Sequence, residues 1–400
     1  KSFITSALAS FTKNNKILIF GSTLLIIIFS IVGIFKLEVE NSFINYFDKE
    51  TEIYKGMKKI DDDLGGTTPL NIILKFPSKS KDIKVKDDEL DEWEEEIETN
   101  ENKAKYWFTR DKMDKIIKVH DYLDSLPEIG KVLSFGSILR VAEDLNNKKL
   151  QSLEIAVLYS KIPEAIKKEI VLPYISVEKD EARISVRIKD SLKDLRRNDL
   201  INKINFDLNT KLNLEKNEYK LAGVLILFNN LLQSLFKSQI LTLGIVILGI
   251  FLMFLILFRN TVLSLIGIVP NFIAAFFILG IIGLLGIPLD MMTITIAAIT
   301  IGIAVDNSIH YIYRFKEEFK KINNYNKTLD KCHSTVGVAI LNTSITIVFG
   351  FSILVLSKFI PTIYFGIFTG IAMLLAMISV LTLLPKLILT FKPFGKETKI

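Results

Sequence analysis

The sequence predicts a polytopic α-helical membrane protein that carries a large extracytoplasmic α+β domain. Half of the 400 residues are hydrophobic, and the mean hydropathy of +0.36 is too high for an ordinary soluble protein. Several segments reach the length of about 20 apolar residues that a bilayer crossing requires. A long polar stretch, residues 36–238, separates the first of these segments from the others.

The six candidate spans cover residues 17–35, 240–258, 262–285, 291–313, 336–356 and 363–389. The first follows a basic start, as the core of a signal peptide does. Its apolar run is too long for such a core, however, and no small-residue cleavage site follows it. We therefore interpret this segment as a membrane anchor.

Basic residues assign the orientation of the spans. Lysines precede the first span, and Lys and Arg gather between the fourth and the fifth, whereas the opposite loops, GIPLD and SKFIP, carry one basic residue between them. Because basic loops face the cytoplasm, both termini are predicted to be cytoplasmic. The expected parts are a cytoplasmic start with the first helix (1–35), the extracytoplasmic domain (36–238), a five-helix bundle (239–390) and a cytoplasmic tail (391–400).

The extracytoplasmic insert alternates strand and helix patterns. TPLNIILKF, KVLSF and EYKLAG read as strands, and LPYISVEKDEARISVRIKD as two strands around a polar turn. Residues 110–126 and 192–212 have helical spacing of their apolar residues. This order predicts an α+β domain of the split βαβ, ferredoxin-like type. The acidic run at 87–98 is either a solvated loop or an acidic patch for a cationic ligand.

An acid and an imidazole interrupt the fourth span, in the stretch TIGIAVDNSIHYIYRF. Residues four apart share a helix face, so Ala298, Gly302, Asp306, His310 and Arg314 form one stripe. If the helix ends near Arg314, Asp306 lies about 12 Å inside that end. A carboxyl group there must face protein or water, and a poorly solvated one can exchange a proton near neutral pH. We predict a proton relay through Asp306 and His310. The alternatives are a structural pair that joins helices and, for His310, a ring that only extends towards the nearby membrane interface.

Further polar residues are candidate partners of this relay. They either satisfy the Asp306 carboxyl or make ordinary interhelical hydrogen bonds. These candidates are Asn307 directly after the acid and, in the fifth span, Asn342, Thr343 and Thr346.

Small residues and proline suggest structural roles in the bundle. Gly302 allows close helix approach, Pro270 is expected to kink the third span, and Gly366 with Gly370 has the spacing of a packing face. The single cysteine, Cys332, excludes a disulfide within the chain. The sequence has no metal-ligand cluster and no Gly-rich phosphate loop, so no metal site is predicted. His120 and His333 are predicted to be surface residues.

One helix, a large outer domain and five further helices resemble one half of a transporter of the resistance-nodulation-division (RND) superfamily. The most specific stretch is GIPLDMMTITIAAITIGIAVDNSIHYIYRFKEEF, which is similar to the fourth helix in the lipid or hydrophobe exporters of MMPL-like type. Residues 240–385 also resemble the five-helix sterol-sensing domain, and YKLAGVLILFNN fits the same pattern. With its non-Met start, we expect the chain to be the C-terminal half of a longer protein or one subunit of a pair.

The resemblance implies a secondary active transporter and not an enzyme. Its implied activity is proton antiport in the bacterial inner membrane, which drives export or transfer of hydrophobic or lipid-like molecules through a periplasmic porter domain. The driving force is the proton gradient, and no cofactor is implied. Asp306 occupies the position of the acid that takes up and releases the proton, although many relatives have Tyr where this chain has Asn307.

The resemblance also implies partners. We expect membrane lipids or hydrophobic small molecules and a second RND half or protomer, while a periplasmic partner protein is left open. No nucleic acid is expected.

Two other classes of protein share parts of this pattern. Accessory subunits of the protein-secretion translocon have the same six-helix layout and an acid in the fourth helix, but their usual motif is Asp-Ala-Asn, whereas here Asn307 follows Asp306 directly. A non-transporting lipid sensor of the sterol-sensing type would leave Asp306 with a structural role.

Overall fold

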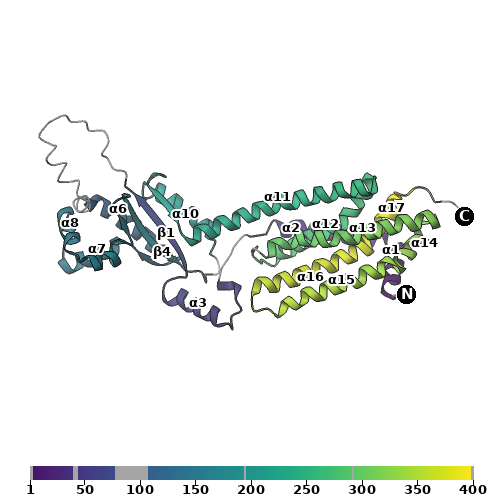
Figure 1. Cartoon of the computed structure of the whole chain (residues 1–400), viewed down its shortest axis with the longest axis horizontal. Coiled ribbons are helices and arrows are strands. Elements are labelled where there is room, and N and C mark those ends of the chain that lie inside the picture. Colours follow the sequence, from purple (N-terminus) through teal and green to yellow (C-terminus); the bar gives the residue numbers. More distant parts are fainter. Residues whose placement is uncertain (1–2, 39–43, 77–106, 193–194, 291, 398–400) are drawn as a thin grey trace, which may run out of the picture. The chain divides into compact units, whose positions relative to one another are not determined.

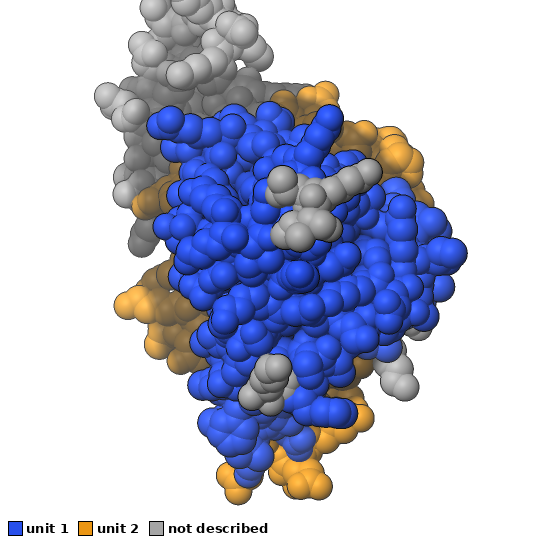
Figure 2. Space-filling view, turned by 90° about the vertical axis from the view of Figure 1, so that its right-hand side faces the viewer, with its two compact units in different colours: residues 1–41, 46–48, 232–400 blue, residues 42–45, 49–231 orange. Residues whose placement is uncertain are grey.

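The computed structural model describes residues 3–38, 44–76, 107–192, 195–290 and 292–397. The chain divides into two compact units. Unit 1 comprises residues 1–41, 46–48 and 232–400, and unit 2 comprises residues 42–45 and 49–231, shown in blue and orange in Figure 2. The acidic run at 87–98 lies outside the described residues.

Six helical segments in the described chain are long and apolar enough to cross a membrane, which confirms the predicted polytopic class. The spans are α2 (Lys16–Ile34), α11 (Val224–Phe258), α12 (Thr261–Leu284), η2 with α13 (Thr293–Thr295 and Ile296–Ile322), α15 with η3 (Val336–Ser352 and Ile353–Leu356), and α16 with α17 (Ile360–Leu381 and Leu383–Phe391).

Small residues bring the helices of unit 1 close together. A Cβ atom added at Gly280 on α12 would lie 2.5 Å from the Cα of Ser30 on α2, so only glycine fits there. Ala274, Ala304 and Ala376 form a small buried cluster that joins α12, α13 and α16 (Figure 1). Close backbone approach of this kind stabilises membrane helices, which gain little from the hydrophobic effect among lipid tails.

The fourth spanning helix is longer than the sequence pattern predicts. The pattern ends near Arg314, whereas α13 continues to Ile322 and stops at Asn323, whose φ of 53° is left-handed. The extension is polar but helical, and the Arg314 guanidinium pairs with Glu318 at 2.8 Å one turn along. Because this extension is charged, Asp306 still lies about 12 Å inside the end of the apolar stretch near Arg314.

Two helices outside the spans lie at one end of unit 1. These are α1 (Phe3–Asn14), which precedes α2, and α14 (Tyr325–Ser334), which connects α13 to α15. Together with α17 they form the end of unit 1 that faces the viewer in Figure 2. Lys386 on α17 fixes α1 there, because its ammonium group donates to the carbonyl oxygens of Thr12 at 2.7 Å and Lys13 at 2.9 Å.

Unit 2 is built on a small antiparallel sheet of strand order β2-β4-β1-β5, with the short β3 paired to β4. The strands are β1 (Thr68–Lys75), β2 (Ile129–Leu133), β3 (Ile175–Ser176), β4 (Glu181–Ile188) and β5 (Tyr219–Ala222). The helices are α3 (Glu52–Asp63), α6 (Arg110–Asp124), α7 (Phe135–Asn146), α8 (Ser152–Lys161), α9 (Glu164–Ile170) and α10 (Arg197–Thr210), and the 3₁₀ turn η1 (Ile44–Tyr46) precedes them.

Alternation along β4 makes the core of unit 2. Ala182, Ile184, Val186 and Ile188 are buried, while the side chains between them are not. Apolar residues of α6 and α10, such as Ile116 and Ile204, belong to the same buried cluster. The strands and these two helices lie where the sequence pattern predicts them, but that pattern did not locate α3, α7, α8 or α9.

A buried carboxylate joins α3 to the sheet of unit 2. Asp61 is 1% exposed and accepts hydrogen bonds from the main-chain N–H groups of Thr67 (3.0 Å), Asp190 (2.8 Å) and Ser191 (2.9 Å) and from the Thr67 hydroxyl (3.0 Å). Burial alone raises the pKa of Asp61, but the hydrogen bonds from the Ser191 hydroxyl and from the main chain outweigh it and hold this pKa below its ordinary value.

Candidate functional site

The predicted relay lies on an open face of unit 1. Oδ1 of Asp306 is 3.3 Å from Nε2 of His310, one turn along α13, so the two side chains form the expected pair. The Asp306 side chain is 71% exposed and that of His310 is 65% exposed. The pair therefore faces outward from the bundle of this chain and is not enclosed by it.

The small residues of the same stripe also face outward. Gly302 is exposed, and a Cβ atom added there would meet no heavy atom of the chain within 4 Å. Ala298 is half-buried. The close helix approach that Gly302 permits is thus unused within unit 1.

The polar residues of α15 are exposed as well, but they do not contact the relay. The hydroxyl of Thr346 donates to the carbonyl oxygen of Asn342 at 2.9 Å, and that of Thr343 to Ala339 at 3.0 Å, both within α15. Among the residues that the structure describes, no hydrogen bond links Asp306 to Asn342, Thr343 or Thr346. Asn307 is buried, on another face of α13 from Asp306.

A buried hydrogen bond joins α12 to the inner face of α13. The side-chain N–H of Asn271 donates to Ser308 Oγ and to the Gly267 carbonyl, both at 3.1 Å. Pro270 lies inside α12 and is buried, as is Asn271 next to it.

The two glycines of the predicted packing face on α16 do not pack equally tightly. A Cβ at Gly366 would lie 2.6 Å from the Phe351 carbonyl oxygen, whereas one at Gly370 would have ordinary contact with Val348.

A second histidine, which the sequence analysis placed on the surface, is buried beside α13. His333 of α14 is 1% exposed; its Nδ1 lies 3.1 Å from the Tyr311 hydroxyl, and its Nε2 lies 2.9 Å from the Leu381 carbonyl oxygen. Burial lowers the pKa of His333, against the opposing effect of the carbonyl oxygens of Leu381 and of Leu329, the latter 3.1 Å from Nδ1. The prediction for His120 was also wrong, because it is 6% exposed and contacts Ser134 Oγ at 2.9 Å.

The chemistry of the exposed pair is acid–base. A carboxylate at the centre of a spanning helix costs about 3 kcal/mol when it faces hydrocarbon, so such groups face protein or water. An acid with an imidazole at one-turn spacing can hold a proton and pass it on. No group of three or more His, Cys, Asp or Glu side chains in the described ranges has the arrangement of a metal site.

Comparison with known proteins assigns the family. The model of the MMPL family matches residues 102–398, which is well over half of the chain and includes α13 with its acid. The chain belongs to the MMPL family. This places it in the RND superfamily of membrane transporters, as the fourth-helix motif predicts.

A membrane protein of Methanocaldococcus jannaschii is similar along almost its whole length. The two sequences are 26% identical over 398 residues, and the match covers 96% of this chain and 93% of the relative. The match therefore runs through nearly all of both chains, which are similar in length.

Proposed function

We propose that this MMPL-family chain is a proton-driven transporter that exports or transfers hydrophobic or lipid-like molecules, with Asp306 as the proton-carrying group. Family membership supports transport of lipid-like substrates. The proton coupling rests on one observation, namely that an acid paired with His310 lies within the apolar part of α13, on its open face.

The exposure of Asp306 supports a covering partner. An ionised group cannot be left against hydrocarbon without a cost of about 3 kcal/mol, so the face that carries Asp306, His310 and Gly302 needs a protein surface or water over it. We propose that a second RND half or a second protomer supplies this surface. The stripe of small residues beside the acid would let a helix of that partner approach closely.

Several finer assignments belong to the same proposal. The strand order β2-β4-β1-β5, with α6 after β1 and α10 after β4, supports a split βαβ, ferredoxin-like porter domain in unit 2. Clustered lysines between α13 and α15 support a cytoplasmic location for that loop and for both ends of the chain, with unit 2 on the other side of an inner membrane. The likeness of residues 240–385 to a sterol-sensing domain supports lipid as the substrate class.

The test is gradient-driven lipid transfer in proteoliposomes. The probe is a fluorescent short-chain phosphatidylglycerol placed in one leaflet, and its transfer is measured by quenching with and without an imposed pH gradient. Asp306→Asn should abolish the gradient-dependent part of the rate. Glu317→Gln is the control, because Glu317 is an acid on the same helix that pairs with Lys320 outside the apolar stretch.

The same experiment separates the proposal from the sensor alternative and tests the role of Asp306. Gradient-driven transfer that persists in Asp306→Asn would refute proton coupling at this residue. An absence of any transfer by the unmodified protein, with lipid binding retained, would favour the sensor class.

A further inference from the structure

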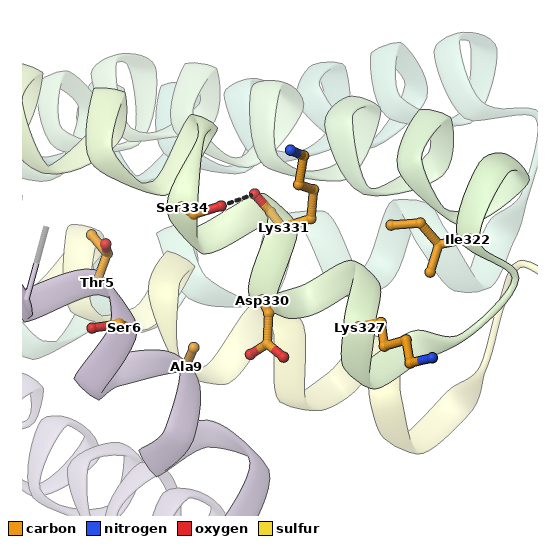
Figure 3. A pocket seen from close by; sticks show the side chains of 8 residues that line it. All are labelled: Thr5, Ser6, Ala9, Ile322, Lys327, Asp330, Lys331 and Ser334. Atoms are coloured by element: carbon orange, nitrogen blue, oxygen red, sulfur yellow. Dashed lines mark hydrogen bonds between the residues drawn. The ribbon is translucent and has the colours of Figure 1, made fainter. Parts of the chain in front are cut away.

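A cavity of about 630 Å³ lies at the end of unit 1 between α1 and α14, outside the relay described above. Its lining comes from α1, α14 and the last residue of α13, namely Thr5, Ser6, Ala9, Ile322, Lys327, Asp330, Lys331 and Ser334 (Figure 3). Pockets for small ligands have volumes of about 300–1,000 Å³, so this cavity is large enough for a lipid headgroup.

The balance of charge at the cavity is positive. Lys327 and Lys331 are one helical turn apart on α14, and neither has an ion-pair partner among the residues that the structure describes. The one acid of the lining, Asp330, is neutralised by Lys13 of α1, whose Nζ lies 2.5 Å from its Oδ2. Two unpaired ammonium groups therefore remain beside the cavity.

The donors around the cavity suit a phosphate group. Lysine binds phosphate oxygens as a point charge, and hydroxyl groups can add hydrogen bonds. Ser6 and Ser334 now donate to carbonyl oxygens of their own helices, Phe3 and Lys331, both at 2.9 Å, and each hydroxyl can rotate towards a ligand. In Figure 3 the Asp330 carboxylate points towards α1 while the lysine side chains extend away from it, so binding would draw the two flexible lysine stems together.

The position of the cavity indicates a lipid as the source of the phosphate. The lining helix α14 ends directly before the span Val336–Leu356, so this end of the helix lies near the level of the headgroups. Next to Ser6, the side chains of Phe3 and Ile4 are 86% and 53% exposed on α1. A short helix that shows apolar side chains beside cationic ones is typical of the membrane interface.

We propose that this cavity binds the phosphate group of an anionic phospholipid, with Lys327 and Lys331 as the recognising residues and α1 as the second wall. The bound lipid bridges α1 and α14, which are otherwise joined by the Lys13–Asp330 ion pair. The site does not depend on the proton relay, because no relay residue lines it.

The test measures lipid binding to the purified full chain. After delipidation in detergent, phosphatidylglycerol or phosphatidylcholine is added back and the bound lipids are counted by native mass spectrometry. A lysine near an anionic lipid contributes about fivefold to affinity, so Lys327→Gln with Lys331→Gln should weaken phosphatidylglycerol binding about 30-fold. The matched control is Lys316→Gln with Lys321→Gln, which removes the same charge from lysines that do not line the cavity.

Each outcome decides the proposal. Selective loss of phosphatidylglycerol in the first double variant, with retention in the control, supports it. Equal binding of phosphatidylglycerol by the first double variant and the unmodified protein would overturn it, and so would equal binding of the two lipids by the unmodified protein. Inorganic phosphate that binds with the same dependence on the two lysines, while phosphatidylglycerol does not bind, would assign the cavity to soluble phosphate and refute the lipid.

Discussion

Replacement of Asp61 tests the hydrogen bonds that connect α3 to the sheet of unit 2. In Asp61→Ala the main-chain N–H groups of Asp190 and Ser191 lose the acceptor that they have at 2.8 and 2.9 Å. The N–H of Thr67 is less affected, because it also donates to the Ile188 carbonyl oxygen at 3.1 Å. The hydroxyls of Thr67 and Ser191 lose their acceptor as well.

The size of the effect follows from these contacts. Each buried N–H left without a partner costs about 1–3 kcal/mol, and each hydroxyl adds about 1 kcal/mol, so the two N–H groups and two hydroxyls give a loss of about 6 kcal/mol in the free energy of unfolding. For a domain of this size, each kcal/mol shifts the melting temperature by about 2–4 °C, so the expected decrease is about 18 °C. Asp61→Asn keeps one acceptor oxygen and should lose about half as much free energy.

The chain carries a separate probe for each unit. Both tryptophans, Trp93 and Trp107, are in the sequence of unit 2, and Trp107 is buried against Phe76 and Phe108. The only cysteine, Cys332, is buried in α14 of unit 1, and burial raises the pKa of its thiol to about 12, so a thiol-reactive dye labels it only on unfolding. Asp61→Ala should shift the tryptophan transition and leave the cysteine transition in place.

The control for Asp61 is Asp63→Ala, which removes an exposed acid from the end of the same helix and should change stability by less than about 0.5 kcal/mol. Equal tryptophan transitions in the two variants would refute the reasoning. The pH dependence gives an independent check. Because the pKa of Asp61 is lower in the folded state, its contribution is complete above the ordinary pKa of about 4 and is lost as pH falls below it. The stability difference between the unmodified protein and Asp61→Ala should therefore shrink on acidification.

Two further predictions concern unit 1 and use the Cys332 probe. Gly280→Ala places a methyl group 2.5 Å from the Cα of Ser30 and should lower the free energy of unfolding by about 1–3 kcal/mol. The control is Gly21→Ala on α2, where a Cβ meets nothing within 4 Å, and it should not lower the cysteine transition. Equal shifts of the two variants would contradict tight packing of α2 on α12. His333→Leu leaves the buried Tyr311 hydroxyl without its hydrogen-bond partner. This single variant should lose about 2 kcal/mol more free energy of unfolding than the double variant in which Tyr311→Phe also removes the hydroxyl. If the losses in the two single variants add up to the loss in the double variant, the contact between Tyr311 and His333 contributes nothing to stability.

Much of the fold could be predicted because it depends on local patterns. Apolar runs gave the six spans, and the alternation of Ala182, Ile184, Val186 and Ile188 gave β4. The end of α13 was missed because a hydropathy pattern ends where charged residues begin. The helix itself ends only where the backbone leaves the helical conformation, here at Asn323. The burial of His120 and His333 could not be predicted either, since it results from helices far apart in the chain that pack over them.

The site was predictable in its residues but not in its surroundings. The four-residue spacing puts Asp306 next to His310, and the structure has them 3.3 Å apart. The spacing of residues along a helix does not show which of its faces the other helices of the same chain cover. That depends on how α12, α15 and α16 pack around α13, and they leave Asp306 outside.

The two faces of α13 therefore carry different kinds of polar contact. On the inner face Ser308 bonds to Asn271 of α12, and Tyr311 bonds to His333 of α14, so neutral hydrogen bonds join α13 to two neighbouring helices. On the outer face Asp306 and His310 have only each other within the described chain. Under the proposed function, a change in the charge of Asp306 acts first on whatever covers that face, because no other helix in the described part of the chain makes an ion pair or hydrogen bond with the carboxylate. The inner bonds would then make α13 move together with α12 and α14 when that covering surface shifts, which is how proton binding at one residue can reach the rest of unit 1.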